Sequence, residues 1–196
     1  MAKYSLDPIS DNCYPDTTVL INKFDIYDED ALEEIETVIT SQKIALLEQQ
    51  PLAGGFDFEH YKAIHQFIFE DLYEWAGESR TVNISKTGTI FCPHDKIAEQ
   101  ADAIFVYLGK NDYFRNLPRS EFILEIVDFY NNTNYLHPFR EDNGRSQRVF
   151  VAHLVRNAGY DIDFADADED LLMIATMRAA GGVNDLLIEL FDEIVK

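Results

Sequence analysis

The sequence predicts a mainly α-helical protein with one β-hairpin, and three observations support this. Apolar residues recur at helical spacing through most of the 196 residues, the period changes once between residues 80 and 91, and glycines follow several helical stretches. No internal repeat, low-complexity tract or Gly/Ser-rich linker divides the chain. We therefore expect about seven helices in a single domain over residues 1–196. Its N-terminal arm and first helix fill 1–55, and its core fills 56–196.

The N-terminal quarter should contain an arm and a helix. Residues 5–27 are punctuated by Pro and Asp, which favours an extended arm docking through its aliphatic residues at 19–21. A helical pattern begins at Asp28, where negative charge on the first turn complements the helix dipole. A second helix is expected from Phe58 to Trp75, stopping at Gly77.

After the second helix, the spacing of apolar residues changes from the helical period to that of a β-strand. Residues 80–85 and 89–91 are short β-prone runs around Lys86-Thr87-Gly88, which predicts a hairpin standing alone among helices. Because an isolated two-stranded hairpin is marginally stable, it should be either a structural brace or a mobile functional flap.

Five helices should follow the hairpin. Helical spacing returns over residues 97–108 and again over 122–130. A further helix is expected from about Asn143 to Asn157, ending at Gly159. Two C-terminal helices, at roughly 166–180 and 183–195, should be separated by Gly181-Gly182.

Charge and composition limit the kinds of partner that this chain can bind. Sixteen Lys and Arg residues face 36 Asp and Glu, a formal charge of -20 that repels nucleic acid and anionic lipid. Cys13 and Cys92 are the only thiols and indicate neither a disulfide scaffold nor a zinc site. No signal peptide or apolar stretch of about 20 residues is present. We expect a cytoplasmic protein with no nucleic-acid or membrane partner.

Most of the candidate catalytic and ligand-binding residues lie in the segment 135–148, between two predicted helices. His137 is a base that can titrate near neutral pH, and Glu141 is an oxygen ligand suited to Mg²⁺. Arg145 and Arg148 lie three residues apart on the first turn of a helix, where both could reach one anion. Asn143 offers an amide and Gly144 a close backbone approach. Together they indicate nucleotidyl or phosphoryl transfer.

This segment, His137-Pro138-Phe139-Arg140-Glu141-Asp142-Asn143-Gly144-Arg145-Ser146-Gln147-Arg148, resembles the Fic family motif H-x-F-x-(D/E)-G-N-G-R-x-x-R. Asp142 stands where the motif has its first glycine. The runs 14–23, 64–77 and 80–85 also look like Fic-domain sequence. The resemblance implies a Fic fold and a bacterial protein adenylyltransferase, a nucleotidyltransferase that moves AMP from the co-substrate ATP onto a Tyr, Thr or Ser hydroxyl of a target protein.

The resemblance also implies a role for each matching residue. His137 would be the general base, Phe139 would anchor the loop, and Glu141 would hold Mg²⁺. The nucleotide would be bound by Asp142, Asn143, Gly144, Arg145 and Arg148. The flap that pins the target by strand addition would comprise Asn83, Ile84, Ser85, Lys86, Thr87 and Gly88.

Asp142 is the departure from the motif. A carboxylate about 4–5 Å from a phosphate oxygen costs about 3–4 kcal/mol at an effective dielectric of ~20, less whatever Mg²⁺ offsets. Three outcomes follow: weakened AMP transfer, a second metal ligand beside Glu141, or a changed donor. On this reasoning Asp142→Gly should tighten nucleotide binding.

Several residues have plainer readings. Asn143 and Asp142 are also ordinary N-cap residues for the following helix. His65 and His153 fit satisfied core histidines, and His60 and His94 should be exposed.

Regulation and alternatives remain open at this stage. Many Fic proteins carry an inhibitory helix of pattern [S/T]-x-x-x-E, and no Ser or Thr of this chain has Glu four residues on. The resemblance then implies inhibition in trans by a small antitoxin chain, as in toxin-antitoxin systems, or a chain trimmed of its own inhibitory segment. Delivery to another cell as an effector fits the same class. The alternative functions are transfer from another phosphate-containing donor, or a nucleotide-impaired binding module.

Overall fold

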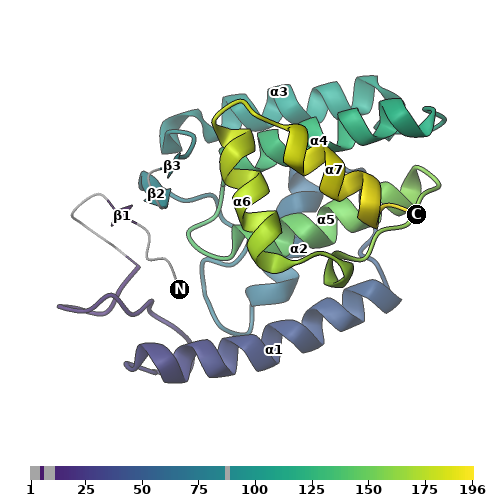
Figure 1. The fold of residues 1–196 in the computed structure, drawn as a ribbon. Helices are drawn as coiled ribbons and strands as arrows, with labels where there is room; N and C mark the ends of the chain where they lie inside the picture. The colour runs from purple at the N-terminus through teal and green to yellow at the C-terminus, as the bar shows by residue number, and fades with distance from the viewer. Residues whose placement is uncertain (1–4, 7–11, 87–88) are drawn as a thin grey trace.

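A computed structural model describes residues 5–6, 12–86 and 89–196, and most of the described chain is helical (Figure 1). The mainly α prediction is confirmed. The described residues form α1 (Glu29–Gln49), α2 (Phe58–Phe69), α3 (Ile97–Lys110), α4 (Arg119–Leu136), α5 (Asn143–Asn157), α6 (Glu169–Ala180) and α7 (Asp185–Ile194). Short 3-10 turns lie at His94–Lys96, Asp112–Phe114 and Phe164–Asp166. Within this part of the chain, no helix is both long and apolar enough to cross a bilayer.

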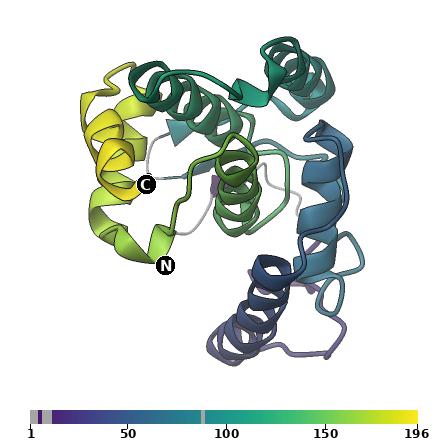
Figure 2. The ribbon, with the colours of Figure 1, turned by 90° about the vertical axis from the view of Figure 1, so that its right-hand side faces the viewer.

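Helix α5 holds the central place in the packing. It contacts α1, α2 and α4, and its stretch from Val149 to Val155 is buried throughout. α6 and α7 pack on each other and on α4, while α1 lies along the outer edge of the molecule (Figures 1 and 2). The first turn of α5 therefore lies where α1, α4 and α6 can all supply side chains.

Aspartate N-caps set several helix starts. The Asp28 carboxylate accepts from the Ala31 amide at 2.9 Å, and Asp57 accepts from the His60 amide at 2.8 Å. Asp168 does the same for α6. Each cap satisfies an amide that has no partner inside its helix, so these starts could be read from sequence.

The second helix ends earlier than predicted, at Phe69 rather than Trp75. The amides of Leu72 and Tyr73 both turn back to the Phe69 carbonyl, at 2.9 and 3.0 Å. This turn buries the two adjacent side chains and stacks Tyr73 on Trp75. The Leu72 carbonyl then accepts from the Lys23 amide at 2.8 Å. Docking of the arm thus overrides the helical pattern.

The arm itself docks through part of its aliphatic run. Val19 and Leu20 are buried in the core, whereas Ile21 is 45% exposed. The prediction that all three would dock was therefore wrong for Ile21.

The hairpin is present, but it does not stand alone. Strands β2 (Ile84–Lys86) and β3 (Thr89–Ile90) pair antiparallel, and the predicted tip residues Thr87 and Gly88 lie outside the described residues. Strand β1 (Ser5–Leu6) pairs with the other edge of β2, placing Ser5 opposite Ser85. The order is β1-β2-β3. The third strand supplies backbone hydrogen bonds that a two-stranded hairpin lacks.

Candidate active site

His137 terminates α4 in a left-handed conformation, with φ 41° and ψ 59°. Its amide donates to the Thr133 carbonyl at 3.1 Å, and its ring stacks on Phe91 with 3.7 Å between ring centroids. The Nδ1 atom lies 3.2 Å from the Asn134 carbonyl oxygen. Because a carbonyl can only accept, Nδ1 carries the proton in the neutral ring and the lone pair lies on Nε2.

Burial keeps this imidazole neutral. His137 is 6% exposed, and desolvation lowers its pKa to about 3, with smaller contributions from the charges of Arg80 and Lys86. A neutral imidazole can accept a proton at any physiological pH. A bound polyphosphate would add negative charge nearby and shift this pKa upward.

Phe139 and Asn143 hold the loop after His137. The Phe139 side chain is fully buried and stacks on His65, with 3.9 Å between ring centroids. The Asn143 carbonyl oxygen accepts from the Phe139 amide at 2.8 Å, and its Nδ2 donates to the Phe139 carbonyl at 2.9 Å. Asn143 was assigned from sequence to a phosphate or to a helix cap. In the structure both ends of its amide hold the loop backbone.

His65 of α2 reaches the same loop. Its Nδ1 accepts from the Gly77 amide at 2.9 Å, so Nε2 carries the proton and donates to the Glu141 carbonyl at 3.2 Å. His65 is a buried, hydrogen-bonded histidine as expected from sequence. Its bond to the motif loop was missed, because 76 residues separate the partners and no spacing rule links them.

The buried state of His65 predicts an acid-sensitive fold. Burial lowers its pKa to about 3, against about 6.5 when unfolded. The unfolded chain therefore binds more protons between these values, so stability falls as the pH falls through that window. We expect His65→Gln to be less stable at pH 7, with the gap from the natural chain narrowing by about 2–3 kcal/mol between pH 6.5 and 4.5. Urea unfolding at a series of pH values measures this; two parallel stability curves would contradict it.

The other histidines divide between surface and core. His94 is exposed, as predicted. His153 is buried as predicted, but neither of its ring nitrogens has a hydrogen-bond partner among the described residues, so the expectation of a satisfied histidine was wrong. His60 was predicted to be exposed, and this was wrong because it is 5% exposed. Its ring packs on Phe56 and Phe150, and burial lowers its pKa.

A cavity of about 350 Å³ opens beside His137. The polar part of its lining includes His137, Lys86 of β2, and Gly144 and Arg148 at the start of α5. The 3-10 turn before α6 and α6 itself supply a largely apolar part of the lining: Phe164, Leu172, Met173 and Met177. A volume of this size, with both charged and apolar lining residues, suits a ligand that carries a flat apolar group and an anion.

The start of α5 gives the polar part of the lining its anion-binding character. Ser146 is the first residue whose amide turns back, to the Asp142 carbonyl at 3.4 Å, so the amides before it have no acceptor within the helix. A Cβ at Gly144 would lie 3.3 Å from Nη1 of Arg148, so a side chain there would crowd the guanidinium. Arg148 also lies beside the buried Tyr130 hydroxyl, where it opposes the pKa increase that burial causes. Amides and guanidinium together favour an anion here.

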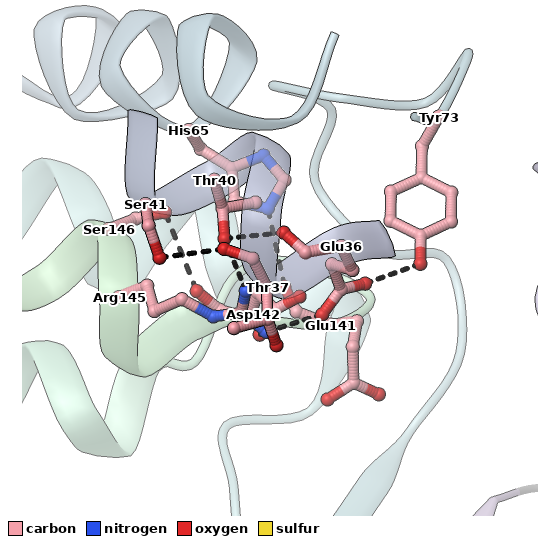
Figure 3. A network of polar contacts seen from close by, with 10 residues as sticks. All are labelled: Glu36, Thr37, Thr40, Ser41, His65, Tyr73, Glu141, Asp142, Arg145 and Ser146. Atoms are coloured by element: carbon pink, nitrogen blue, oxygen red, sulfur yellow. Dashed lines mark hydrogen bonds and ion pairs between the residues drawn. The ribbon is translucent and has the colours of Figure 1, made fainter. Parts of the chain in front are cut away.

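Arg145 takes a different position from Arg148. It pairs with Glu36 and Asp142, and its Nη1 donates to the Thr40 hydroxyl at 2.7 Å (Figure 3). It does not line the cavity beside His137, so the expectation that it shares one ligand there with Arg148 does not match its position. Both arginines line a second cavity between α1, α5 and residues 162–165. Arg145 is turned toward α1 because two carboxylates attract it.

Glu36 is the centre of this network and was not found from sequence. It is buried on α1, where it accepts from the Tyr73 hydroxyl at 2.5 Å on one side and from Arg145 on the other (Figure 3). A signal was present: Glu36 falls on the buried face of α1 with Leu32, Thr40 and Leu47. A charged residue on such a face needs a partner.

Asp142 fits its position through its backbone. Its φ of 57° and ψ of 29° are left-handed, a conformation that glycine adopts freely and that Asp tolerates better than most residues. Its carboxylate makes no capping hydrogen bond and pairs with Arg145 beside Glu36. Burial, then the negative charge of Glu36, raise its pKa well above the usual value. The charge is thus weakened and compensated, and Asp142 does not line the cavity beside His137.

This geometry revises the expected effect of Asp142→Gly. We now expect the dissociation constant of a non-hydrolysable ATP analogue to fall by about tenfold or less, which is about 1.4 kcal/mol, because Arg145 already offsets the charge. The melting temperature should stay equal or rise, since removing a buried carboxyl with a raised pKa removes a desolvation cost. Calorimetry and thermal unfolding measure the two effects. Weaker nucleotide binding would contradict the first.

Glu141 supplies a carboxylate that could bind a cation. Burial raises its pKa to about 7, against the opposing charges of Arg140 and Lys86. No group of three or more His, Cys, Asp or Glu side chains gathers in a metal-binding arrangement among the described residues. A single, partly buried carboxylate fits Mg²⁺, which binds proteins through one or two carboxylates and takes its other ligands from phosphate and water.

The arrangement defines a class of protein before any relative is considered. A helical scaffold presents a neutral histidine and the N-terminus of a buried helix to one cavity, and a small β-sheet borders that cavity. The profile of the Fic/DOC family matches residues 55–155. The chain belongs to the Fic/DOC family.

Similar proteins agree with this membership. The chain is 35% identical over 189 residues to the protein adenylyltransferase VbhT of Bartonella schoenbuchensis, covering 95% of this chain and 39% of that protein. It is also 35% identical to the probable protein adenylyltransferase y4lH of Sinorhizobium fredii, covering 93% of each. The crystal structure of BepC from Bartonella tribocorum, with bound AMPPNP, superposes with a TM-score of 0.88 at 25% identity, covering 94% of this chain and 96% of that one.

Proposed function

We propose that this protein is an adenylyltransferase that transfers AMP from ATP to a hydroxyl side chain of a target protein. The observation that supports it most is that His137, Gly144 and Arg148 line the same cavity. The names of VbhT and y4lH and the nucleotide analogue bound to BepC support the same reaction.

The reaction needs one base and one anion site. Nε2 of His137 accepts the proton of a Tyr, Thr or Ser hydroxyl as the hydroxyl oxygen attacks the α-phosphorus. The bond from that phosphorus to the bridging oxygen of the β-phosphate breaks, and pyrophosphate leaves. The products are an AMP ester on the target and pyrophosphate. The buried, neutral state of His137 leaves it ready to accept this proton.

The phosphates would bind at the first turn of α5. The amides near Gly144 and the guanidinium of Arg148 would hold the phosphates, and the apolar wall of α6 would face the purine. Asn143 would act mainly by fixing the loop through Phe139. Arg145 would reach a phosphate only after leaving Glu36 and Asp142, so Arg148 should carry more of the binding.

Magnesium would be held by Glu141. The ion supplies positive charge to the phosphates when it is bound. Its loading should weaken below neutral pH, because Glu141 must lose its proton to bind a metal.

The target would pair with the small sheet beside the cavity. Lys86 of the predicted flap lines it, and the other edge of β2 is already paired with β1. Strand addition would therefore occur at β3, where Ile90 is 77% exposed. Main-chain pairing would tolerate different target sequences.

Inhibition would come from a small antitoxin chain in trans, as in toxin-antitoxin systems. The second cavity, lined by Arg145, Arg148 and Arg156 together with Glu48 and Asp163, offers such a chain a place to dock beside the phosphate-binding arginine. The cytoplasm would be the site of action, either of the producing bacterium or of a cell that receives the protein; the likeness to BepC, a VirB-translocated Bartonella effector, supports the second.

Transfer of label from ATP tests the proposal. The chain is incubated with lysate and ATP labelled in the α-phosphate, with ATP labelled in the γ-phosphate as the control. A protein band that carries α-label only, and that disappears with His137→Ala, is the expected result. Label from neither nucleotide, together with capture of a partner, would favour the binding module; a mass adduct other than AMP would favour another donor. A folded, nucleotide-bound chain that stays inactive alone would contradict inhibition in trans.

A further inference from the structure

Arg80 is a buried cation that no step above uses. It lies between the Gly77 turn and β2 and is 4% exposed. Its Nε donates to the His137 carbonyl at 2.8 Å and its Nη1 to the Val82 carbonyl at 2.7 Å. Its Nη2 donates to the Cys92 carbonyl. One side chain thus holds three carbonyls from two distant segments.

These partners are unusual for a buried arginine. Among the described residues, no carboxylate lies within ion-pair distance of Arg80. Burial lowers its pKa to about 10, so it remains a cation at neutral pH. Removing a charge from water is costly, and neutral carbonyls repay less of that cost than a carboxylate would. What Arg provides in return is a planar fork that fixes several acceptors relative to one another.

The three carbonyls belong to the parts that must meet in the reaction. Val82 leads into β2, Cys92 follows β3, and His137 is the candidate base. Two backbone hydrogen bonds join the same two segments. The Arg80 amide donates to the Pro138 carbonyl at 2.8 Å, and the Cys92 amide donates to the Tyr135 carbonyl at 2.9 Å. Both ends of the hairpin are therefore attached to the His137 loop, with Arg80 at the centre.

We propose that Arg80 is a positioning residue that fixes the acceptor-binding hairpin relative to His137. This proposal rests on the proposed function. Arg80 does not line the cavity beside His137, so it acts on the alignment of the acceptor hydroxyl rather than on the nucleotide. Its loss should therefore separate nucleotide binding from transfer.

Arg80→Lys tests this, because lysine keeps the charge and loses the fork. We expect the rate of AMP transfer to the lysate protein to fall about 100-fold, as a misplacement of roughly 1 Å can cause. The dissociation constant of a non-hydrolysable ATP analogue should change less than about threefold, well under 1.4 kcal/mol. The matched control is Arg119→Lys, because Arg119 also donates to two backbone carbonyls, those of Asp192 and Val195, but far from the cavity. It should leave transfer unchanged.

A second readout does not depend on transfer. In Arg80→Lys, hydrogen exchange at the β2 and β3 amides should speed up together with a shift of the His137 imidazole NMR signals. The proposal would be overturned if Arg80→Lys transferred AMP at the rate of the natural chain. It would also be overturned if hydrogen exchange and the imidazole signals were unchanged. Equal losses of nucleotide binding and transfer would also overturn it, since they would mark a general scaffold role. Failure of the natural chain to transfer label counts against the proposed function only, because the NMR and exchange readouts still decide the role of Arg80.

Discussion

Replacing His137 by alanine is expected to lower the rate of AMP transfer by about 10²–10⁴-fold, the usual contribution of a positioned general base. In the proposed reaction the lone pair on Nε2 of His137 accepts the proton, because Nδ1 is engaged with the Asn134 carbonyl. Nucleotide affinity should change little, because Arg148 and the α5 amides stay in place. Single-turnover transfer and calorimetry on the same preparation separate the two quantities.

The control for this variant is His94→Ala, which removes an exposed histidine near the hairpin. It should transfer AMP at the natural rate. His137→Ala also loses the stack on Phe91, so its melting temperature must be measured. A folded His137→Ala chain that keeps transferring AMP would show that another group takes the proton.

Replacing Glu36 by alanine should be the most destabilising single change in the network of Figure 3. It leaves the half-buried Arg145 with less compensation and removes the acceptor of the Tyr73 hydroxyl. Breaking a buried pair from one side costs about 3–5 kcal/mol. For a chain of this length, each kcal/mol lowers the melting temperature by about 2–4 °C. Thermal and urea unfolding measure the loss.

Two variants bracket this result. Glu33→Ala removes an exposed glutamate from the same helix and should change stability by about 0.5 kcal/mol or less. Glu36→Gln keeps an acceptor for Tyr73 and should fall between alanine and the natural residue. If Glu36→Ala were as stable as Glu33→Ala, the pairing with Arg145 would carry no net stability.

The helices could be predicted where local chemistry sets their limits. Asp28 begins α1, and α5 spans Asn143–Asn157 as predicted, because caps and apolar spacing act within a few residues. The end of α2 could not be predicted in this way. It depends on the Lys23 amide meeting the Leu72 carbonyl across nearly fifty residues of chain. The pairing of Ser5–Leu6 with β2 joins residues that lie even farther apart in the chain.

The residues of the candidate site also divide into those that are close in sequence and those that only the fold brings together. His137, Glu141 and Arg148 are close in sequence, so one segment suggested them together. Glu36, His65 and Arg80 reach that segment only through the fold. The position of Arg145 shows the limit most clearly: its spacing from Arg148 is correct for a shared ligand, but the partner on α1 decides its direction.

The left-handed backbone at Asp142 restricts how this position can be probed. Alanine has no polar group to bond locally and suffers a steric cost there, so an alanine scan would mix backbone strain with loss of charge. Asparagine keeps nearly the same shape and tolerates the same conformation. The difference between asparagine and aspartate at 142 therefore isolates the carboxyl group, and the difference between glycine and asparagine isolates the presence of a side chain.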